Sequence, residues 1–143
     1  MAESMFVFVE SSQLPTVRAL RKKVSLMGLE LEEWEEELRA IEGFWPGKLR
    51  GQEVGFEFCI DKLQKEDKDE LALNTNELNG RDYMIELSFY NELDVEAAVI
   101  CVVALCQLSD GISFNENEEL KVNRNNALEW AKDEMGYHLE VKL

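Results

Sequence analysis

The sequence contains few of the residues on which catalysis and metal binding usually depend. It has three cysteines, Cys59, Cys101 and Cys106, and one histidine, His138, in 143 residues. A nucleophilic triad would have to use that one histidine, and no set of ligands has the spacing of a zinc site. The odd number of cysteines, all inside apolar runs, argues against a disulfide framework and for a reducing compartment. We therefore expect no catalytic residues, no metal, no cofactor and a cytoplasmic location.

Long apolar segments are also lacking. The longest nearly uncharged run, Val95–Leu108, is interrupted by Glu96 and Gln107 and is too short to cross a bilayer. The first residues, MAESMFVFVESS, have neither the basic start nor the long apolar stretch of a secretory signal. The sequence therefore predicts no membrane partner.

Basic residues are scarce relative to acidic ones. The chain carries 15 Lys and Arg against 30 Asp and Glu, which gives a formal net charge of −15. Such a field repels nucleic acid phosphates and anionic lipids and attracts basic proteins, although it would also keep a protein soluble without any partner. We expect a basic protein partner and no nucleic acid. The sequence leaves the oligomeric state open.

The acidic residues gather in two tracts. The first, Glu30–Glu42, contains seven acids and one base, Arg39, and the second, Glu86–Glu119, contains no Lys or Arg. Acidic residues that served only solubility would be distributed more evenly along the chain. We therefore expect one of the tracts to contact the partner. The predicted contact residues are Glu116, Glu118 and Glu119 in the second tract, which we favour, and Glu33, Glu36 and Glu37 in the first.

Apolar periodicity and turn residues predict the elements of the fold. Alternating apolar residues and runs rich in Val and Phe predict strands, whereas apolar residues three and four apart predict helices. Strands are expected at 5–10, 29–31, 52–60, 83–90, 112–114 and 137–143. Helices are expected at 14–27, capped by Ser12, at 31–42, at 91–108 and at 123–135, with loops at 43–51 and 61–79.

This order of elements predicts a single acidic α+β domain over residues 1–143. A mainly antiparallel sheet of about five strands would carry its helices chiefly on one face. The helix at 91–108 is apolar almost all round, so it should lie against the sheet and be covered on its other side as well. We expect its residues Val99, Val102, Val103 and Leu105 in the main core.

Three short motifs approach catalytic or metal-binding signatures. Gly43–Lys48 is one residue short of a phosphate loop, and Leu49 stands where Ser or Thr must hold magnesium. Asp61–Glu70 is acidic but lacks the oxygen ligands and the central glycine of an EF-hand. Glu140-Val141-Lys142 matches the E-x-K half of a metal-dependent nuclease, a pattern that arises often by chance in so charged a chain. The nuclease is kept as an alternative, which the net charge disfavours.

Two stretches carry a family resemblance. Gly43–Asp61 contains an aromatic-Pro turn, a short polar link and a strand reading G-F-E, and Glu86–Glu119 contains a strand, an apolar helix and a D-G-x-x-F turn. In these features the chain resembles small bacterial immunity proteins carried beside polymorphic or contact-dependent toxins. The resemblance implies a cytoplasmic binder without an active site, and it assigns no site residues.

The main hypothesis is therefore a stoichiometric inhibitor of a basic toxin or nuclease. An adaptor or chaperone-like domain of housekeeping type, a phosphate-mimicking decoy and an unrecognised enzyme are the alternatives.

Overall fold

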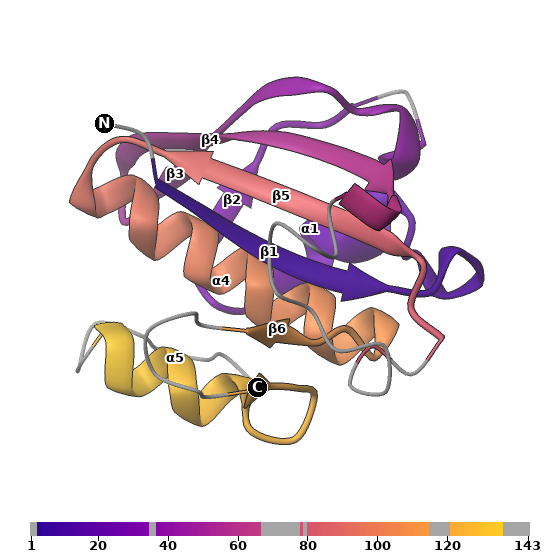
Figure 1. The fold of residues 1–143 in the computed structure, drawn as a ribbon. Coiled ribbons are helices and arrows are strands. Elements are labelled where there is room, and N and C mark those ends of the chain that lie inside the picture. The colour runs from indigo at the N-terminus through magenta and orange to yellow at the C-terminus, as the bar shows by residue number, and fades with distance from the viewer. Residues whose placement is uncertain (1–2, 35–36, 67–77, 79, 115–120, 136–143) are drawn as a thin grey trace.

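A five-stranded antiparallel sheet in the order β1-β5-β4-β3-β2 forms the frame of the molecule (Figure 1). The computed structural model describes residues 3–34, 37–66, 78, 80–114 and 121–135. The strands of the sheet are β1 (Glu3–Val9), β2 (Leu29–Leu31), β3 (Gly43–Leu49), β4 (Gln52–Lys62) and β5 (Tyr83–Phe89). A second sheet pairs β6 (Ser113–Phe114) with β7 (Lys121–Val122). It lies beside β1, where Ile112 forms a bridge with Phe8.

The helices lie on one face of the sheet. They are α1 (Val17–Ser25), α4 (Glu92–Ser109) and α5 (Ala127–Met135), with short 3-10 helices at Ser11–Gln13 and Leu38–Ala40. α4 packs against β1, β4 and β5, while α1 and α5 both pack against α4. Figure 1 looks onto the sheet with α1 and α4 behind it and α5 below α4. The predicted α+β fold, with an antiparallel sheet of five strands and helices on one face, is confirmed.

The main core lies between the sheet and α4. Every residue from Ala97 to Cys106 is buried, and Val99, Val102, Val103 and Leu105 belong to the main core as predicted. From the sheet, fully buried Trp45 packs edge-on against Phe58, with ring centroids 5.2 Å apart. This helix has no polar side because it is covered by the sheet on one side and by α1 and α5 on others.

Both ends of α4 are capped. At the start, the Asn91 side chain accepts a hydrogen bond from the Asp94 N–H at 3.0 Å. At the end, Asp110 adopts the left-handed conformation with φ of 52°. Arg81 donates to the Asp110 carbonyl oxygen from Nε at 3.0 Å and from Nη2 at 2.7 Å, and Nη1 donates to the Leu78 carbonyl at 3.1 Å. A cation at a helix C-terminus is favourable because the last carbonyls carry partial negative charge.

The start of α1 differs from the prediction. The helix begins at Val17 rather than Leu14, and Thr16, not Ser12, caps it by accepting a hydrogen bond from the Ala19 N–H at 3.0 Å. Leu14 has φ of −60° and ψ of 130°, which is extended backbone. The following Pro15 explains this, because proline disfavours the helical conformation of the residue before it.

The predicted acidic helix at 31–42 is wrong. Among its described residues, only Leu38–Ala40 are helical, as a single 3-10 turn. The backbone after β2 stays extended instead: the Glu32 N–H donates to the Pro46 carbonyl at 3.0 Å. A helix would also have placed glutamates four residues apart, such as Glu33 and Glu37, on one side, where like charges are destabilising. Leu31, Leu38 and Ile41 are nevertheless buried, so their spacing marks core positions correctly.

The predicted loop at 43–51 is also wrong, because most of it is strand β3. Leu49 pairs with Gln52 across a two-residue turn in which Arg50 and Gly51 have φ of 51° and 78°. Two positive φ values at the central positions are those of a type I′ hairpin turn. Phe44 points outward, whereas Trp45 is fully buried.

Proline is tolerated inside β3 because a neighbouring side chain replaces its missing donor. The hydrogen bond from the Glu32 N–H to the Pro46 carbonyl continues the β2–β3 register by one residue and sets Glu32 opposite Pro46, which cannot donate back to the Glu32 carbonyl. The indole Nε1 of Trp45 donates to that carbonyl at 2.9 Å instead. Pro46, which favoured the prediction of a loop, is thus compatible with a strand.

Two predicted segments fall wholly or largely outside the described residues. The predicted loop at 61–79 is described only at 61–66 and 78, and β4 extends into it through Lys62. The predicted strand at 137–143, which contains His138 and the Glu140-Val141-Lys142 motif, lies outside the described part of the chain.

Candidate partner-binding face

The face of the sheet turned away from α4 is left uncovered by α1, α4 and α5 (Figure 1). Successive strand residues point to opposite faces, so each strand contributes alternate residues to it. At the end where β4 finishes, Leu63 and Leu78 pack on Phe8 and close that part. We call the remaining surface the open face. It comprises the outward-pointing residues Ser4, Phe6, Glu30, Phe44, Pro46, Lys48, Glu53, Gly55, Glu57, Cys59, Asp61, Glu86 and Ser88.

Carboxylates from separate parts of the sequence surround Cys59 in the middle of the open face. Glu86 is the register partner of Cys59 on β5, and Asp61 follows on β4. Burial, followed by the negative charges of Glu86, Asp61 and Glu42, raises the pKa of the Cys59 thiol to about 11. Negative neighbours act in this direction because they disfavour the thiolate. The raised pKa therefore reflects burial first and the negative charge of this face second.

Hydroxyl groups, rather than cations, hold Glu86 in place. The Ser4 hydroxyl donates to Glu86 Oε1 at 3.2 Å, and the hydroxyls of Ser4 and Ser88 lie 2.7 Å apart. These bonds orient the carboxylate without neutralising it. Its charge remains available to a ligand.

Cations are nearly absent from the open face. Lys48 is the one cation among the open-face residues, against five carboxylates. Within the part of the chain that the structure describes, the ion pairs are Arg50 with Glu96 and Arg81 with Asp110, and neither lies on this face. The carboxylates are Glu30, Glu53, Glu57, Asp61 and Glu86.

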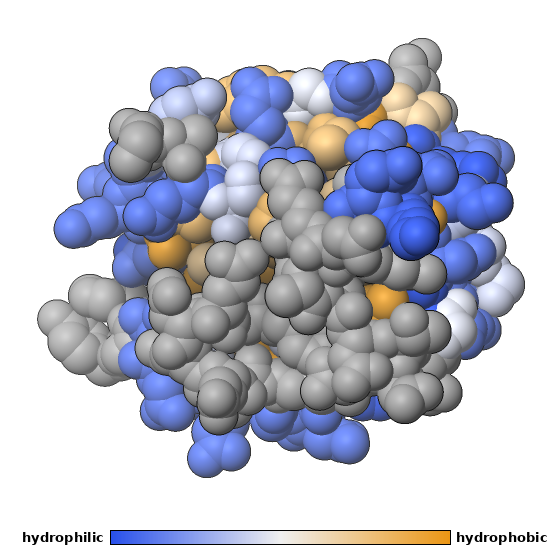
Figure 2. All heavy atoms as spheres, viewed as in Figure 1, coloured by the Kyte–Doolittle hydropathy of each residue, from blue (hydrophilic) through white to orange (hydrophobic). Residues whose placement is uncertain are grey.

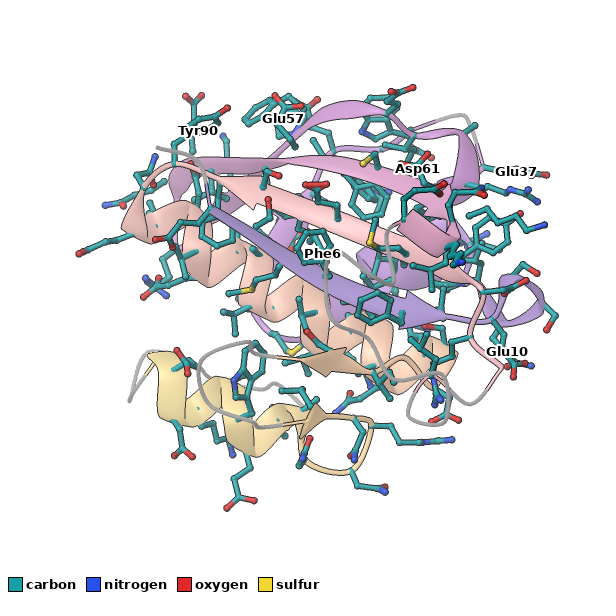
Figure 3. All side chains as sticks on the ribbon, in the orientation of Figure 1. Phe6, Glu10, Glu37, Glu57, Asp61 and Tyr90 are labelled. Atoms are coloured by element: carbon teal, nitrogen blue, oxygen red, sulfur yellow. The ribbon has the colours of Figure 1, made fainter. Side chains whose placement is uncertain are left out.

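Two exposed aromatic side chains mark one end of the open face. Phe44 is 53% exposed and in register with Glu57, and Tyr90, just after β5, is 70% exposed. Tyr90 and Glu57 lie at the same end of the sheet in Figure 3, with Asp61 toward the other end. Figure 2, viewed from this side, shows apolar side chains between hydrophilic ones over the upper part of the molecule. Exposed aromatic rings are more frequent at protein interfaces than on the remaining surface.

The ring of Phe44 lies on the backbone of β4. A Cβ atom placed on Gly55 would be 2.3 Å from Cζ of Phe44 and 2.8 Å from its Cε2, so the ring occupies the space above this glycine. The Gly55 N–H donates to Asp94 Oδ1 at 3.1 Å, and Arg50 in the hairpin turn forms an ion pair with Glu96. The β3–β4 hairpin is thereby fixed to the first turns of α4.

A hollow of about 570 Å³ adjoins Phe44 at this end of the sheet. Its acidic lining residues are Glu30, Glu32, Glu53 and Asp94, and its cations are Arg21 and Lys48. Arg21 already donates from Nε to the Leu31 carbonyl at 2.9 Å. The lining therefore carries an excess of negative charge next to an exposed ring.

The predicted contact residues are only partly described. Glu33 and Glu37 are exposed, and Glu37 points away from the sheet at its right-hand edge in Figure 3. The remaining four, Glu36, Glu116, Glu118 and Glu119, lie outside the described residues. All six stay predictions.

The structure brings together carboxylates that sequence reasoning kept apart. Glu42 belongs to the first acidic tract and Glu86 to the second, yet both act on Cys59. Glu57 and Asp61, which lie between the tracts in the sequence, were not predicted as contacts. The signal that could have found them is the alternation along 52–60, which places Glu53 and Glu57 on the side opposite the apolar residues.

In the described ranges, no three His, Cys, Asp or Glu side chains are grouped as metal ligands would be. None of the helices there has the length and apolar character needed to cross a membrane.

Comparisons with protein-family models, with curated proteins and with solved structures give no match to this chain.

Proposed function

We propose that this chain is a non-enzymatic binding protein that meets a basic protein through its open face. In this proposal it acts in the cytoplasm as a stoichiometric inhibitor of a basic toxin or nuclease, in the manner of an immunity protein. The observation that carries the proposal is the sheet face that α1, α4 and α5 leave uncovered, with five carboxylates, one lysine and an exposed aromatic ring among its described residues. The resemblance of 43–61 and 86–119 to immunity proteins supports the same function.

The charge of the face suits a basic partner in two ways. Complementary charge speeds diffusional encounter, with rate constants up to about 10⁸–10⁹ M⁻¹s⁻¹ at low salt. It also repels nucleic acids and other acidic molecules from the face itself, which therefore stays available to a basic protein. An inhibitor of a nuclease benefits from fast encounter, because it must reach the enzyme before the substrate does.

The aromatic residues supply the contact that charge alone does not. Exposed ion pairs contribute little to stability, about 0–1 kcal/mol each, whereas buried aromatic residues often dominate the energy of an interface. Phe44, the register partner of Glu57, and Tyr90 stand at one end of the face, so a partner attracted by the carboxylates would cover them.

Capture of the partner with a matched pair of variants tests the proposal. The face variant carries Glu57→Gln, Asp61→Asn and Glu86→Gln. The α5 variant carries Glu129→Gln, Asp133→Asn and Glu134→Gln, which removes the same charge from exposed positions on a helix that packs against α4. The parent and the α5 variant should retain the same basic protein from cells that express this chain, and the face variant should retain much less of it.

The captured protein then decides between an inhibitor and an adaptor. A toxin or nuclease activity that the parent abolishes at one molecule per molecule supports the inhibitor. Retention of no basic protein, or equal retention by all three forms, contradicts the proposal.

A further inference from the structure

We propose that the Phe44 end of the open face is a receptor for an arginine side chain of the partner, whose guanidinium group stacks on the Phe44 ring between Glu53 and Glu57. This inference rests on the proposed function and names the chemistry by which that face would recognise its partner. It follows from the position of one ring between two carboxylates.

The Phe44 ring is a platform with one occupied and one free side. Its inner side lies on Gly55, where a Cβ atom would come within 2.3 Å of the ring. Its outer side is open, since the residue is 53% exposed. A ring held on one side by backbone loses little freedom when a ligand stacks on the other side.

The two carboxylates flank this platform along β4. Glu53 and Glu57 lie two residues before and after Gly55, so all three point to the same face. With a rise of about 3.3 Å per residue, each flanking residue lies roughly 7 Å from Gly55 along the strand. Glu57 is in addition the direct partner of Phe44 in the β3–β4 register. A cation above the ring would therefore have a carboxylate on either side.

Both flanking carboxylates are free to accept a cation. Within the described residues, neither Glu53 nor Glu57 forms an ion pair. Lys48, opposite Glu53 in the register, is the one cation of the open face nearby. Its charge opposes a second cation at this place, which makes it a useful probe.

Arginine fits this arrangement better than lysine does. The planar guanidinium group stacks on an aromatic face and presents several N–H donors in its plane, toward carboxylates at the sides. An ammonium group is a compact, strongly hydrated charge without a face to stack. The hollow of about 570 Å³ beside Phe44 leaves room for the side chain.

The test uses an arginine–serine peptide and the same peptide with lysine in place of arginine. Chemical shifts of the labelled protein are followed by NMR at low salt. For the parent, we expect the arginine peptide to shift the Gly55 and Glu57 amides and the Phe44 ring, and to bind about three- to tenfold more tightly than the lysine peptide.

Three variants isolate the roles of the residues. Phe44→Leu should bring the ratio of the two affinities close to one, while both peptides still bind weakly through charge. Phe44→Tyr keeps the ring and should restore the preference for arginine. Lys48→Ala should tighten binding of the arginine peptide, because it removes a competing cation. The exposure of Phe44 and Lys48 makes loss of the fold unexpected, and thermal melting checks this.

The inference is overturned if the shifts lie elsewhere, or if Phe44→Leu leaves the preference for arginine unchanged. It also fails, with the proposed function intact, if the captured partner depends on the face carboxylates but binds Phe44→Leu as tightly as the parent. If the parent protein binds the arginine peptide at Phe44 but captures no basic protein from cells, the proposed function is contradicted instead.

Discussion

The ring of Phe44 rests on Gly55, the residue diagonally opposite it in the β3–β4 pair. Glycine weakens a strand because it adds backbone freedom and offers no side chain to pack. An aromatic residue on the neighbouring strand can cover such a glycine and recover part of the lost packing. Here the same contact keeps an aromatic ring in place on the open face.

Replacement of Gly55 by alanine should displace that ring with little effect on the fold. The new Cβ would lie 2.3–2.9 Å from three ring atoms, but Phe44 is exposed and can swing outward. We expect a change in unfolding free energy within about 1 kcal/mol, because alanine also reduces backbone freedom. Arginine-peptide binding should weaken as it does in Phe44→Leu. Denaturant unfolding and the NMR titration measure the two effects, and unchanged binding would show that the position of the ring is unimportant.

Val103→Asp should destabilise the fold strongly. Val103 is fully buried in the middle of α4, and a carboxylate there would lose its hydration without a partner. We expect a loss of at least about 3 kcal/mol, or no folded protein. Leu108→Asp, at an exposed position on the same helix, is the control and should cost about 1 kcal/mol or less. Equal melting temperatures for Val103→Asp and the parent would refute the packing of α4.

Alkylation of Cys59 should be slow at neutral pH and should report the field of the open face. Only the thiolate reacts, and the pKa of Cys59 is raised to about 11. Glu86→Gln removes a negative charge that contributes to this shift, so the pKa should fall and the reaction at pH 8 should become faster. Cys101 and Cys106 are buried and should stay unmodified. Mass spectrometry after timed iodoacetamide treatment measures the rates, and equal rates in both proteins would count against a carboxylate field at Cys59.

The same thiols predict a loss of stability at alkaline pH. The folded state raises the pKa of Cys59 from 9.0 to about 11, and burial raises the pKa values of Cys101 and Cys106 as well. The folded state therefore holds these protons more tightly than the unfolded chain does. The contribution of these thiols to the free energy of unfolding is fully present below pH 9. It declines as the pH rises through 9 toward 11. Urea unfolding at pH 8 and pH 10 measures the change, which should be smaller in Cys101→Ala if this thiol contributes.

Arg81→Met should weaken the C-terminal end of α4. Methionine keeps the apolar length of the side chain but removes three hydrogen bonds, to the carbonyls of Asp110 and Leu78. Hydrogen bonds from charged groups contribute about 1.5–3 kcal/mol, but two of these three share one exposed carbonyl oxygen, so a total loss of about 2–4 kcal/mol is expected. Arg124→Met, at an exposed arginine, should cost less than about 0.5 kcal/mol. Similar unfolding midpoints for the two variants would contradict the capping role of Arg81.

The strands and helices with regular periodicity could be predicted from the sequence. The alternation at 52–60 and the apolar run at 91–108 are local signals, and both gave the element that the structure contains. The segments at 31–42 and 43–51 were predicted wrongly because their conformations depend on each other. Trp45 supplies the donor that Pro46 lacks only when Glu32 lies opposite, and no local pattern shows that pairing.

The negative charge of the candidate site could be predicted from the sequence, but the residues that form the site could not. The net charge pointed to a basic partner, and the two acidic tracts suggested where it would bind. The carboxylates around Cys59 come from Glu42, Asp61 and Glu86, which only the strand order brings together. The position of Phe44 over Gly55 likewise depends on the β3–β4 register. Neither relationship is contained in the linear order of the residues.

The association rate of the captured basic partner tests the central claim most directly. It is measured at low and high salt for the parent, the face variant and the α5 variant, which lose equal charge at different places. We predict that the face variant associates about tenfold more slowly than the parent at low salt and depends less on salt, while the α5 variant stays close to the parent. If both variants change alike, or neither changes, the acidity serves solubility alone and the open face is not the binding site.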